Sequence, residues 1–220
     1  MPKRLVASDT AVAPVDDAAP VVRSLSALSK AENQCRRCPL YRNATQAVPG
    51  EGPSRAKVML VGEQPGDKED LAGKPFVGPA GRILDKALAD AGIPRAEIFV
   101  TNAVKHFKFE PRGKRRLHKK PNAYEIERCK WWFEQERAIV KPELIVALGA
   151  TGARSVMGRA VKIGKLRGQA LALDDATRVV ITIHPSALLR MQDGDERHAA
   201  YAAFVKDLKI AARLVFSKAA

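Results

Sequence analysis

The feature that most constrains the fold is the apolar run at residues 58–61, which passes directly into the Gly- and Pro-rich segment 62–81. A short apolar run with this ending is typical of a buried parallel strand whose carboxyl end opens into a loop. In open α/β sheets, ligands bind at such strand ends. The segment carries Glu63, Gln64 and Asp67 among its glycines, so the sequence predicts a binding or catalytic loop.

Strands and helices alternate along the rest of the chain. We expect strands at 57–61, 98–104, 144–148 and 179–183, and helices at 26–33, 79–91, 121–140 and 195–216, with one more helix starting near residue 150. Residues 164–178 indicate a turn with a short extended excursion. This alternation favours a parallel sheet between helical layers. The predicted fold class is α/β, a three-layer α/β/α sandwich with a central four-stranded parallel sheet.

The length of 220 residues suits one sizeable core. Residues 1–22 lack a helical or strand period, so we expect a disordered tail there and a single domain at 23–220. No apolar run approaches the roughly 20 residues that span a bilayer, and the N-terminus lacks the apolar region of a secretory signal. We therefore expect a cytoplasmic protein that does not contact membranes and acts as a monomer.

The chain is strongly basic. It has 38 Lys and Arg against 24 Asp and Glu, a formal net charge of +14 and a pI near 10.0. This balance indicates a polyanionic partner, and nucleic acid is the leading one. A basic surface that is merely solvated is the alternative. The densest positive charge lies in the segment 105–120, KHFKFEPRGKRRLHKK.

The chain has three cysteines, of which two form the pattern Cys35-x-x-Cys38 and the third, Cys129, lies in the long predicted helix. An odd number with this spacing does not make a disulfide framework and indicates metal or redox chemistry. A cluster or a tetrahedral metal site has four ligands. Because the chain has three cysteines, another residue, a small thiol or water must supply the fourth ligand. An iron-sulfur cluster and, less well, zinc are both compatible with it.

Polar residues follow three of the predicted strands. Glu63 and Gln64 follow the first, Asn102 closes the second, and His184 and Ser186 follow the last. Because parallel strands end at one edge of a sheet, we expect one common cleft. Asn102 offers both a donor and an acceptor, which suits the amide edge of a pyrimidine. A strand-end cap is the alternative role for an isolated Asn.

Four segments carry a resemblance to a known family. GEQPGDKED with PFVGPAG, then VTNAVK and then HPSALLR, in this order and spacing, resemble the uracil-DNA glycosylase superfamily, especially its iron-sulfur branches, over about residues 31–212. The glycine signatures of dinucleotide and P-loop sites are absent. The resemblance implies uracil-containing DNA as substrate, with the uracil flipped out of the stack. Single-stranded DNA should be preferred, because no pairing energy is needed to expose the base.

The resemblance also implies roles for individual residues. Phe76 would stack on the uracil, Asn102 would recognise its edge, and His184 would stabilise negative charge on the departing base. Glu63 would favour the positively charged sugar at C1′. The remaining residues of the implied uracil-binding set are Gly62, Gln64 and Asp67. Taken singly, Phe76 is compatible with a core position and His184 with a turn.

The basic segment resembles the X class of the superfamily, UdgX, which carries a Lys-Arg-Arg-Ile-His sequence; here residues 114–118 are KRRLH, with Leu117 as the difference. The resemblance implies that His118 is a nucleophile that captures C1′ before water does, leaving the DNA covalently attached. A neutral imidazole is a good nucleophile near pH 7, and Glu63 could accept its proton. Two alternatives stay open: a turning-over glycosylase in which His118 holds a phosphate, and a non-catalytic DNA-binding module.

Two further sets complete the expectations. The side chains expected to bind DNA are Lys105, Lys114, Arg115, Arg116, Ser186 and Arg190. The resemblance implies a [4Fe-4S] cluster with a structural role, held by Cys35, Cys38, Cys129 and, as the fourth-ligand candidate, His106. Relatives with four cysteines have a cysteine at the position of His106.

Overall fold

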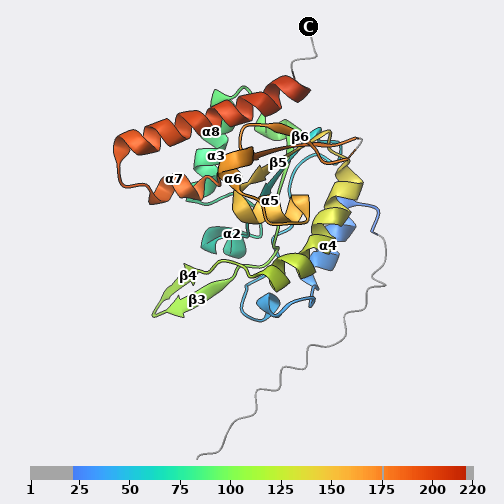
Figure 1. Ribbon diagram of the computed structural model, residues 1–220. Coiled ribbons are helices and arrows are strands. Elements are labelled where there is room, and N and C mark those ends of the chain that lie inside the picture. Colours follow the sequence, from blue (N-terminus) through green and yellow to red (C-terminus); the bar gives the residue numbers. More distant parts are fainter. Residues whose placement is uncertain (1–21, 175, 217–220) are drawn as a thin grey trace, which may run out of the picture.

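The computed structural model describes residues 22–174 and 176–216 (Figure 1). Of the tail expected at 1–22, only Val22 lies within the described residues. Residues 217–220 of the expected domain also lie outside them. The central sheet has the strand order β2-β1-β5-β7-β6. Its parallel strands are β1 (Val58–Gly62), β2 (Ile98–Asn102), β5 (Leu144–Leu148) and β7 (Arg178–Thr182), and the short β6 (Ala170–Ala172) runs antiparallel to β7.

Helices cover both faces of this sheet, which confirms the three-layer α/β/α prediction (Figure 1). The described helices are α1 (Leu25–Asn33), α2 (Asp67–Ala72), α3 (Pro79–Asp90), α4 (Ala123–Val140), α5 (Gly149–Met157), α6 (Ile163–Leu166), α7 (Ser186–Arg190) and α8 (Gly194–Val215), with single 3₁₀ turns at Pro39–Arg42 and Arg95–Glu97. None of them is long and apolar enough to cross a membrane.

The two faces of β1 define the two halves of the core. Val58 and Leu60 pack with α3, α7 and α8, whereas Met59 and Val61 pack with α4 and α5. All five residues of β1 are buried, which explains why this strand is a continuous apolar run without polar alternation.

The strand register brings the polar strand ends together. Gly62 pairs with Asn102 across β1 and β2, and Leu148 pairs with Thr182 across β5 and β7. Because these strands are parallel, the segments that follow them leave the sheet at the same edge. The edge therefore carries the candidate site.

The structure contains several elements that the sequence did not predict as such, the short helices α6 and α7 among them. The basic segment forms a hairpin of β3 (Phe109–Arg112) and β4 (Arg115–His118), turned at Gly113, which has a φ of 57°. Helix α2 lies inside the expected loop, and β6 lies inside the expected turn region 164–178. The hairpin was missed because most of its side chains are exposed and charged, so no apolar alternation marks it. It projects from the body of the fold (Figure 1).

Candidate active site

The centre of the site is a gap between Asn102, Gly62 and Phe76. The Asn102 side-chain oxygen Oδ1 is buried and has no hydrogen-bond partner among the described residues. A Cβ added at Gly62 would lie 2.3 Å from that oxygen and 2.6 Å from Cζ of Phe76. Glycine therefore keeps open the space where an unpaired acceptor and an aromatic ring meet. A planar ring that carries an N–H group fits this arrangement.

The backbone around Phe76 is held in an unusual conformation. Phe76 has a φ of 57°, in the left-handed region that side chains other than glycine rarely adopt. Its carbonyl lies where a Cβ of residue 81 would be, so Gly81 is required for this close approach. The Glu69 carboxylate accepts hydrogen bonds from the backbone N–H groups of Gly78 at 2.7 Å and Gly66 at 3.1 Å. The loop thus supports a strained residue at the site.

His184 follows β7 and lies beside the same gap, with its ring centroid 5.9 Å from that of Phe76. The backbone N–H of Ser186 donates to Nδ1 of His184 at 3.2 Å, and the Ser186 hydroxyl lies 2.8 Å from the same nitrogen. Because Nδ1 accepts, the ring proton of the neutral imidazole is on Nε2. Burial, together with the charges of Arg190 and His118, lowers the pKa of His184 to about 4. Near pH 7 the ring is therefore a neutral N–H donor.

This environment gives a testable titration. We expect the ring signals of His184 in an NMR pH titration to change with a midpoint near pH 4. Because this pKa lies below the ordinary value near 6.5, protonation opposes folding. The stability contributed by this group is complete above about pH 6.5 and falls as the pH drops toward 4. A midpoint near 6.5 in the folded protein would contradict this description of the site.

Glu63 links two elements at the same edge. Its Oε2 accepts a hydrogen bond from the hydroxyl of Thr151, in α5, at 2.5 Å. Its Oε1 lies 3.4 Å from Nε2 of His118, at the end of β4. One carboxylate oxygen is thus fixed by a buried hydroxyl while the other faces a half-exposed imidazole. No pattern in the sequence marks Thr151, because a lone Thr at the start of a helix resembles any capping residue.

The side chain of Gln64 is bonded to the ends of the basic segment. Its side-chain amide nitrogen, Nε2, donates to the carbonyls of Lys108 and Lys119, each at 3.1 Å, and its Oε1 accepts a hydrogen bond from the backbone N–H of Lys108 at 3.2 Å. These bonds use both N–H groups of the amide and occupy its carbonyl. The side-chain amide of Gln64 is therefore fully used within the protein, which leaves its main chain for the expected contact with uracil. The side chain anchors the base of the hairpin, close to His118.

Arg116 was expected to bind DNA and Asp67 to bind uracil. In the structure, the two side chains form an ion pair with each other. Nε of Arg116 donates to Asp67 at 2.6 Å, and Nη1 donates to the buried Asp70 at 2.6 Å. The guanidinium also lies over the rings of Phe107, at 5.5 Å, and Phe109, at 5.1 Å. The arginine thus fastens the hairpin to α2, because its planar fork satisfies two carboxylates at once.

We expect Arg116→Lys to loosen the hairpin while the sheet stays intact. A lysine cannot reproduce the two-carboxylate geometry or the stacking on the aromatic rings. Amide hydrogen exchange at residues 109–118 should accelerate by about tenfold, as expected for the loss of one strong charge-assisted contact. The matched control is Arg115→Lys, at an exposed neighbouring position. Equal exchange in both variants would show that Arg116 does not hold the hairpin.

Lys105 does not reach the surface. Its side chain is completely buried, and Nζ donates to Glu136 at 2.7 Å, to the hydroxyl of Thr101 at 2.5 Å and to the carbonyl of Asn102 at 3.1 Å. The prediction that Lys105 binds DNA is therefore wrong, because its ammonium is enclosed and paired. The sequence could not separate this lysine from the exposed ones that follow it.

The other cationic candidates lie at the surface. Lys114 and Arg115 are exposed on the hairpin, and exposed Arg190 donates from Nη1 to the Ser186 hydroxyl at 3.1 Å. A groove of about 270 Å³ lies beside Thr151. Its lining residues are Lys120, Pro121, Ala123, Ile126, Ala150, Thr151, Arg154, Ala160 and Val161. Lys120 and Arg154 give this groove a positive charge next to Glu63, and the sequence had not singled out either residue.

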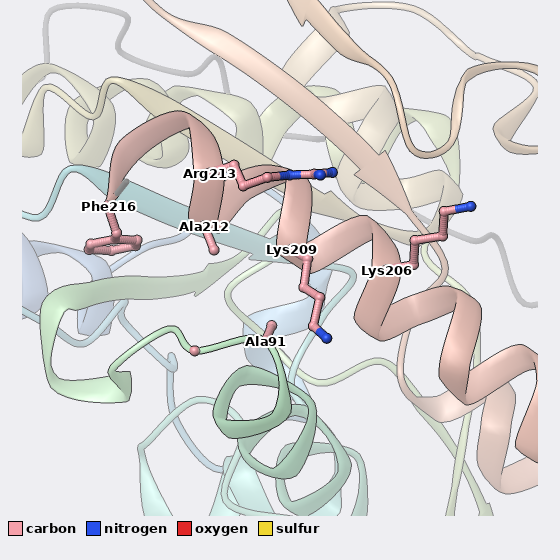
Figure 2. Close-up of a pocket in the computed structure, with 7 residues that line it drawn as sticks. Ala91, Lys206, Lys209, Ala212, Arg213 and Phe216 are labelled. Carbon is pink, nitrogen blue, oxygen red and sulfur yellow. The ribbon is translucent and has the colours of Figure 1, made fainter. Parts of the chain in front are cut away.

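A second hollow, of about 520 Å³, lies between the end of α3 and the last turns of α8 (Figure 2). The side chains of Lys206, Lys209 and Arg213 extend from α8 around it (Figure 2). Ala91 and Gly92 contribute the other wall. None of its lining residues belongs to the strand ends that form the site, so we treat it as separate.

The three cysteines lie in one buried cluster, together with Leu28, Leu40, Val104, Ile126 and Trp132. The sulfur of Cys35 accepts from Nε1 of Trp132 at 3.1 Å, and the sulfur of Cys129 accepts from the backbone N–H of Lys105 at 3.2 Å. Burial raises the pKa of Cys38 to about 11, and it raises that of Cys129 as well. Both are therefore thiols near pH 7 unless a metal replaces the proton.

The donor chemistry of this cluster fits a thiolate-bound metal group, since soft sulfur ligands sit in a dry shell with N–H donors. In the described part of the chain, however, no three His, Cys, Asp or Glu side chains form a group that could hold a metal ion. His106 is also buried. Burial lowers its pKa to about 4, with Asp70 opposing and Arg36 adding to the effect.

Comparison with known proteins gives a consistent result. The model of the family described as "Uracil DNA glycosylase superfamily" matches residues 49–209. A type-4 uracil-DNA glycosylase of Pyrobaculum aerophilum is 40% identical over 173 residues, covering 76% of this chain and 85% of the relative. A type-4 enzyme of Thermotoga maritima is 37% identical, covering 77% and 85%. A type-5 uracil-DNA glycosylase of Pyrobaculum aerophilum is 29% identical, covering 70% and 79%.

Proposed function

Because this chain belongs to the uracil-DNA glycosylase superfamily, we propose that it cleaves the bond between uracil and deoxyribose in DNA. The observation that carries this proposal is the buried, unpaired Oδ1 of Asn102 in the gap between Gly62 and Phe76. An unpaired acceptor in a closed gap costs free energy unless a ligand supplies the donor. The N3–H group of a flipped uracil is such a donor.

The strand-end residues would divide the work of bond cleavage. Phe76 stacks on the flipped base, and Nε2–H of His184 donates to the uracil oxygen O2. When the glycosidic bond breaks, its electron pair leaves with the base, and the negative charge on O2 is stabilised by this hydrogen bond. Positive charge develops at C1′ and is stabilised by the Glu63 carboxylate, whose orientation Thr151 fixes.

We further propose that His118 captures the sugar, as in the X class. The distance of 3.4 Å between Nε2 of His118 and Oε1 of Glu63 supports a proton transfer between them. The N–H bond of the imidazole breaks and its proton passes to Glu63. The freed lone pair forms the bond to C1′, and uracil departs with the electrons of the old bond. The product is DNA joined to the protein.

A denaturing gel tests both parts of the proposal. The protein is mixed with a labelled single-stranded oligonucleotide that contains one uracil, and the mixture is boiled in detergent. We expect a retarded band with the wild type and with His198→Ala, whose histidine is exposed on α8. The band should be absent with His118→Ala.

Other outcomes identify the alternatives. If the band is missing and alkali cleaves the oligonucleotide at the uracil position, the protein turns over as an ordinary glycosylase and His118 is not the nucleophile. If neither a band nor a cleavable site forms although the DNA binds, the protein is a non-catalytic module. A thymine-containing oligonucleotide serves as the control for base choice.

We propose that single-stranded DNA is the preferred partner, because no base pair must be opened to expose the uracil, and that the chain acts as a monomer. Lys114, Arg115 and Arg190 are exposed near the site. Lys120 and Arg154 line the groove beside Thr151, whose hydroxyl donates a hydrogen bond to Glu63. Their charges would bind phosphates without regard to sequence.

For the cysteine cluster, we propose that Cys35, Cys38 and Cys129 hold a [4Fe-4S] cluster with His106 as the fourth ligand. The support is the burial of three thiols in one shell, with N–H donors to two of the sulfurs. When bound, the group would supply covalent cross-links between the N-terminal segment and α4. Iron and zinc analysis with an absorbance spectrum tests this; iron with broad absorbance near ~400 nm supports it, and zinc alone overturns it.

A further inference from the structure

Lys105 is a fully buried cation, and its contacts converge on the end of β2. Glu136, from α4, lies 2.7 Å from its ammonium. The other carboxylate oxygen of Glu136 accepts from the Thr101 hydroxyl at 3.0 Å and from the backbone N–H of Gly50 at 2.9 Å. Both partners of the pair are almost fully enclosed, with side-chain exposures of 0% and 2%. The pair therefore locks α4 to the last two residues of β2.

A second carboxyl group, that of Glu32 in α1, is also completely buried, but it is not the counter-ion. Burial raises the pKa of Glu32 to about 8, and its oxygens have no hydrogen-bond partner among the described residues. Glu136, in contrast, lies 2.7 Å from the ammonium of Lys105. The charged pair is thus Lys105 with Glu136.

The remaining contact of the ammonium reaches the base-recognising residue itself. Nζ of Lys105 donates to the main-chain carbonyl of Asn102 at 3.1 Å. On the far side of Asn102, the next residues bond to β1: the N–H of Ala103 donates to the carbonyl of Gly62, and that of Val104 donates to the carbonyl of Glu63, each at 3.0 Å. Asn102 is thus held between the ammonium and the strand that carries the rest of the site.

We propose that Lys105 is a positioning residue that fixes the Asn102 side chain for uracil, through its bonds to the Asn102 carbonyl and the Thr101 hydroxyl, with Glu136 as its counter-ion. This inference rests on the function proposed above. Asn102 Oδ1 has no bond of its own, so its placement depends on the backbone that carries it. Catalysis is sensitive to this placement, because small displacements of a positioned group are costly.

A double-mutant cycle tests the coupling. Lys105→Met alone would leave Glu136 charged and unpaired, so the test variant combines Lys105→Met with Glu136→Gln, which removes both charges at similar volume. Processing of uracil-containing oligonucleotide is measured in single turnover, with and without Asn102→Ala. The packing control is Phe133→Leu, fully buried on α4 and one turn from Glu136.

We expect the double substitution to slow processing by about 10- to 100-fold when Asn102 is present and by less than about twofold when it is absent. Phe133→Leu should lower the thermal midpoint with little change in rate. If the effects of the double substitution and of Asn102→Ala multiply, Lys105 contributes to packing alone and the proposal is wrong.

A measurement without DNA separates this inference from the proposed function. In protein labelled with ¹⁵N, the side-chain amide signals of Asn102 should shift or broaden in the double variant and stay unchanged in Phe133→Leu. If the wild type does not process uracil, the proposed function fails, and the NMR result alone decides the inference. An unchanged Asn102 signal overturns it.

Discussion

Gly62→Ala should slow the processing of uracil-containing DNA by about 1,000-fold or more, the scale of losing several transition-state contacts at once. The added Cβ would lie 2.3 Å from Oδ1 of Asn102 and 2.6 Å from Cζ of Phe76, so both groups must move. Since β1 is buried throughout, the strand cannot shift to make room. The methyl group would therefore occupy the proposed place of the base and displace the two groups proposed to bind it.

The measurement is the single-turnover rate of adduct formation or uracil release, beside the free energy of unfolding from urea titration. We expect a stability loss of about 1–3 kcal/mol from overpacking, which leaves the domain folded. Gly164→Ala is the matched control, because a Cβ there meets no atom within 4 Å. A Gly62→Ala protein that processes uracil at the wild-type rate would refute the placement of the base.

Glu136→Ala should have the largest effect on stability, a loss of about 3–5 kcal/mol, because it leaves a buried ammonium without its counter-ion. The substitution also removes the acceptor for Gly50 and Thr101. Since Lys105 lies completely inside the protein, water cannot replace the lost carboxylate without opening the core.

Urea denaturation measures this prediction, with an unchanged slope and a lower midpoint as the expected pattern. Glu127→Ala, an exposed position on the same helix, is the control and should change the free energy of unfolding by less than about 0.5 kcal/mol. If Glu136→Ala is no more costly than this control, the buried pair does not stabilise the fold.

Much of the fold could be predicted because the central strands are short apolar runs buried on both faces. The parallel strands β1, β2, β5 and β7 were each expected within a few residues, and the register brings Asn102 beside Gly62 as a common edge requires. Helix α2 was missed, whereas the short strand β6 lies within the extended excursion expected at 164–178. Both are short, and their surroundings rather than their own sequences define them.

The site residues at strand ends could be predicted from the sequence. The surroundings of side chains that pair with residues far away in the sequence could not. Asn102, His184 and Glu63 follow strands, so topology alone gathers them. Lys105 and Arg116 belong to one basic segment, yet one is enclosed beside Glu136 and the other is paired with two aspartates of α2. Local sequence carries no sign of which cation finds a distant carboxylate. The same limit applies to Gln64, whose partners are main-chain carbonyls of the hairpin.

The hairpin gives the molecule a modular design. It adds no strand to the central sheet, and it is attached to the strand ends by the amide of Gln64 and the guanidinium of Arg116. Under the function proposed above, base selection and the fate of the sugar would be encoded in separate pieces of chain. Under that proposal, a change of sequence in the β3–β4 hairpin would alter what happens to the sugar after uracil leaves. The residues at the strand ends, which would select the base, would stay the same.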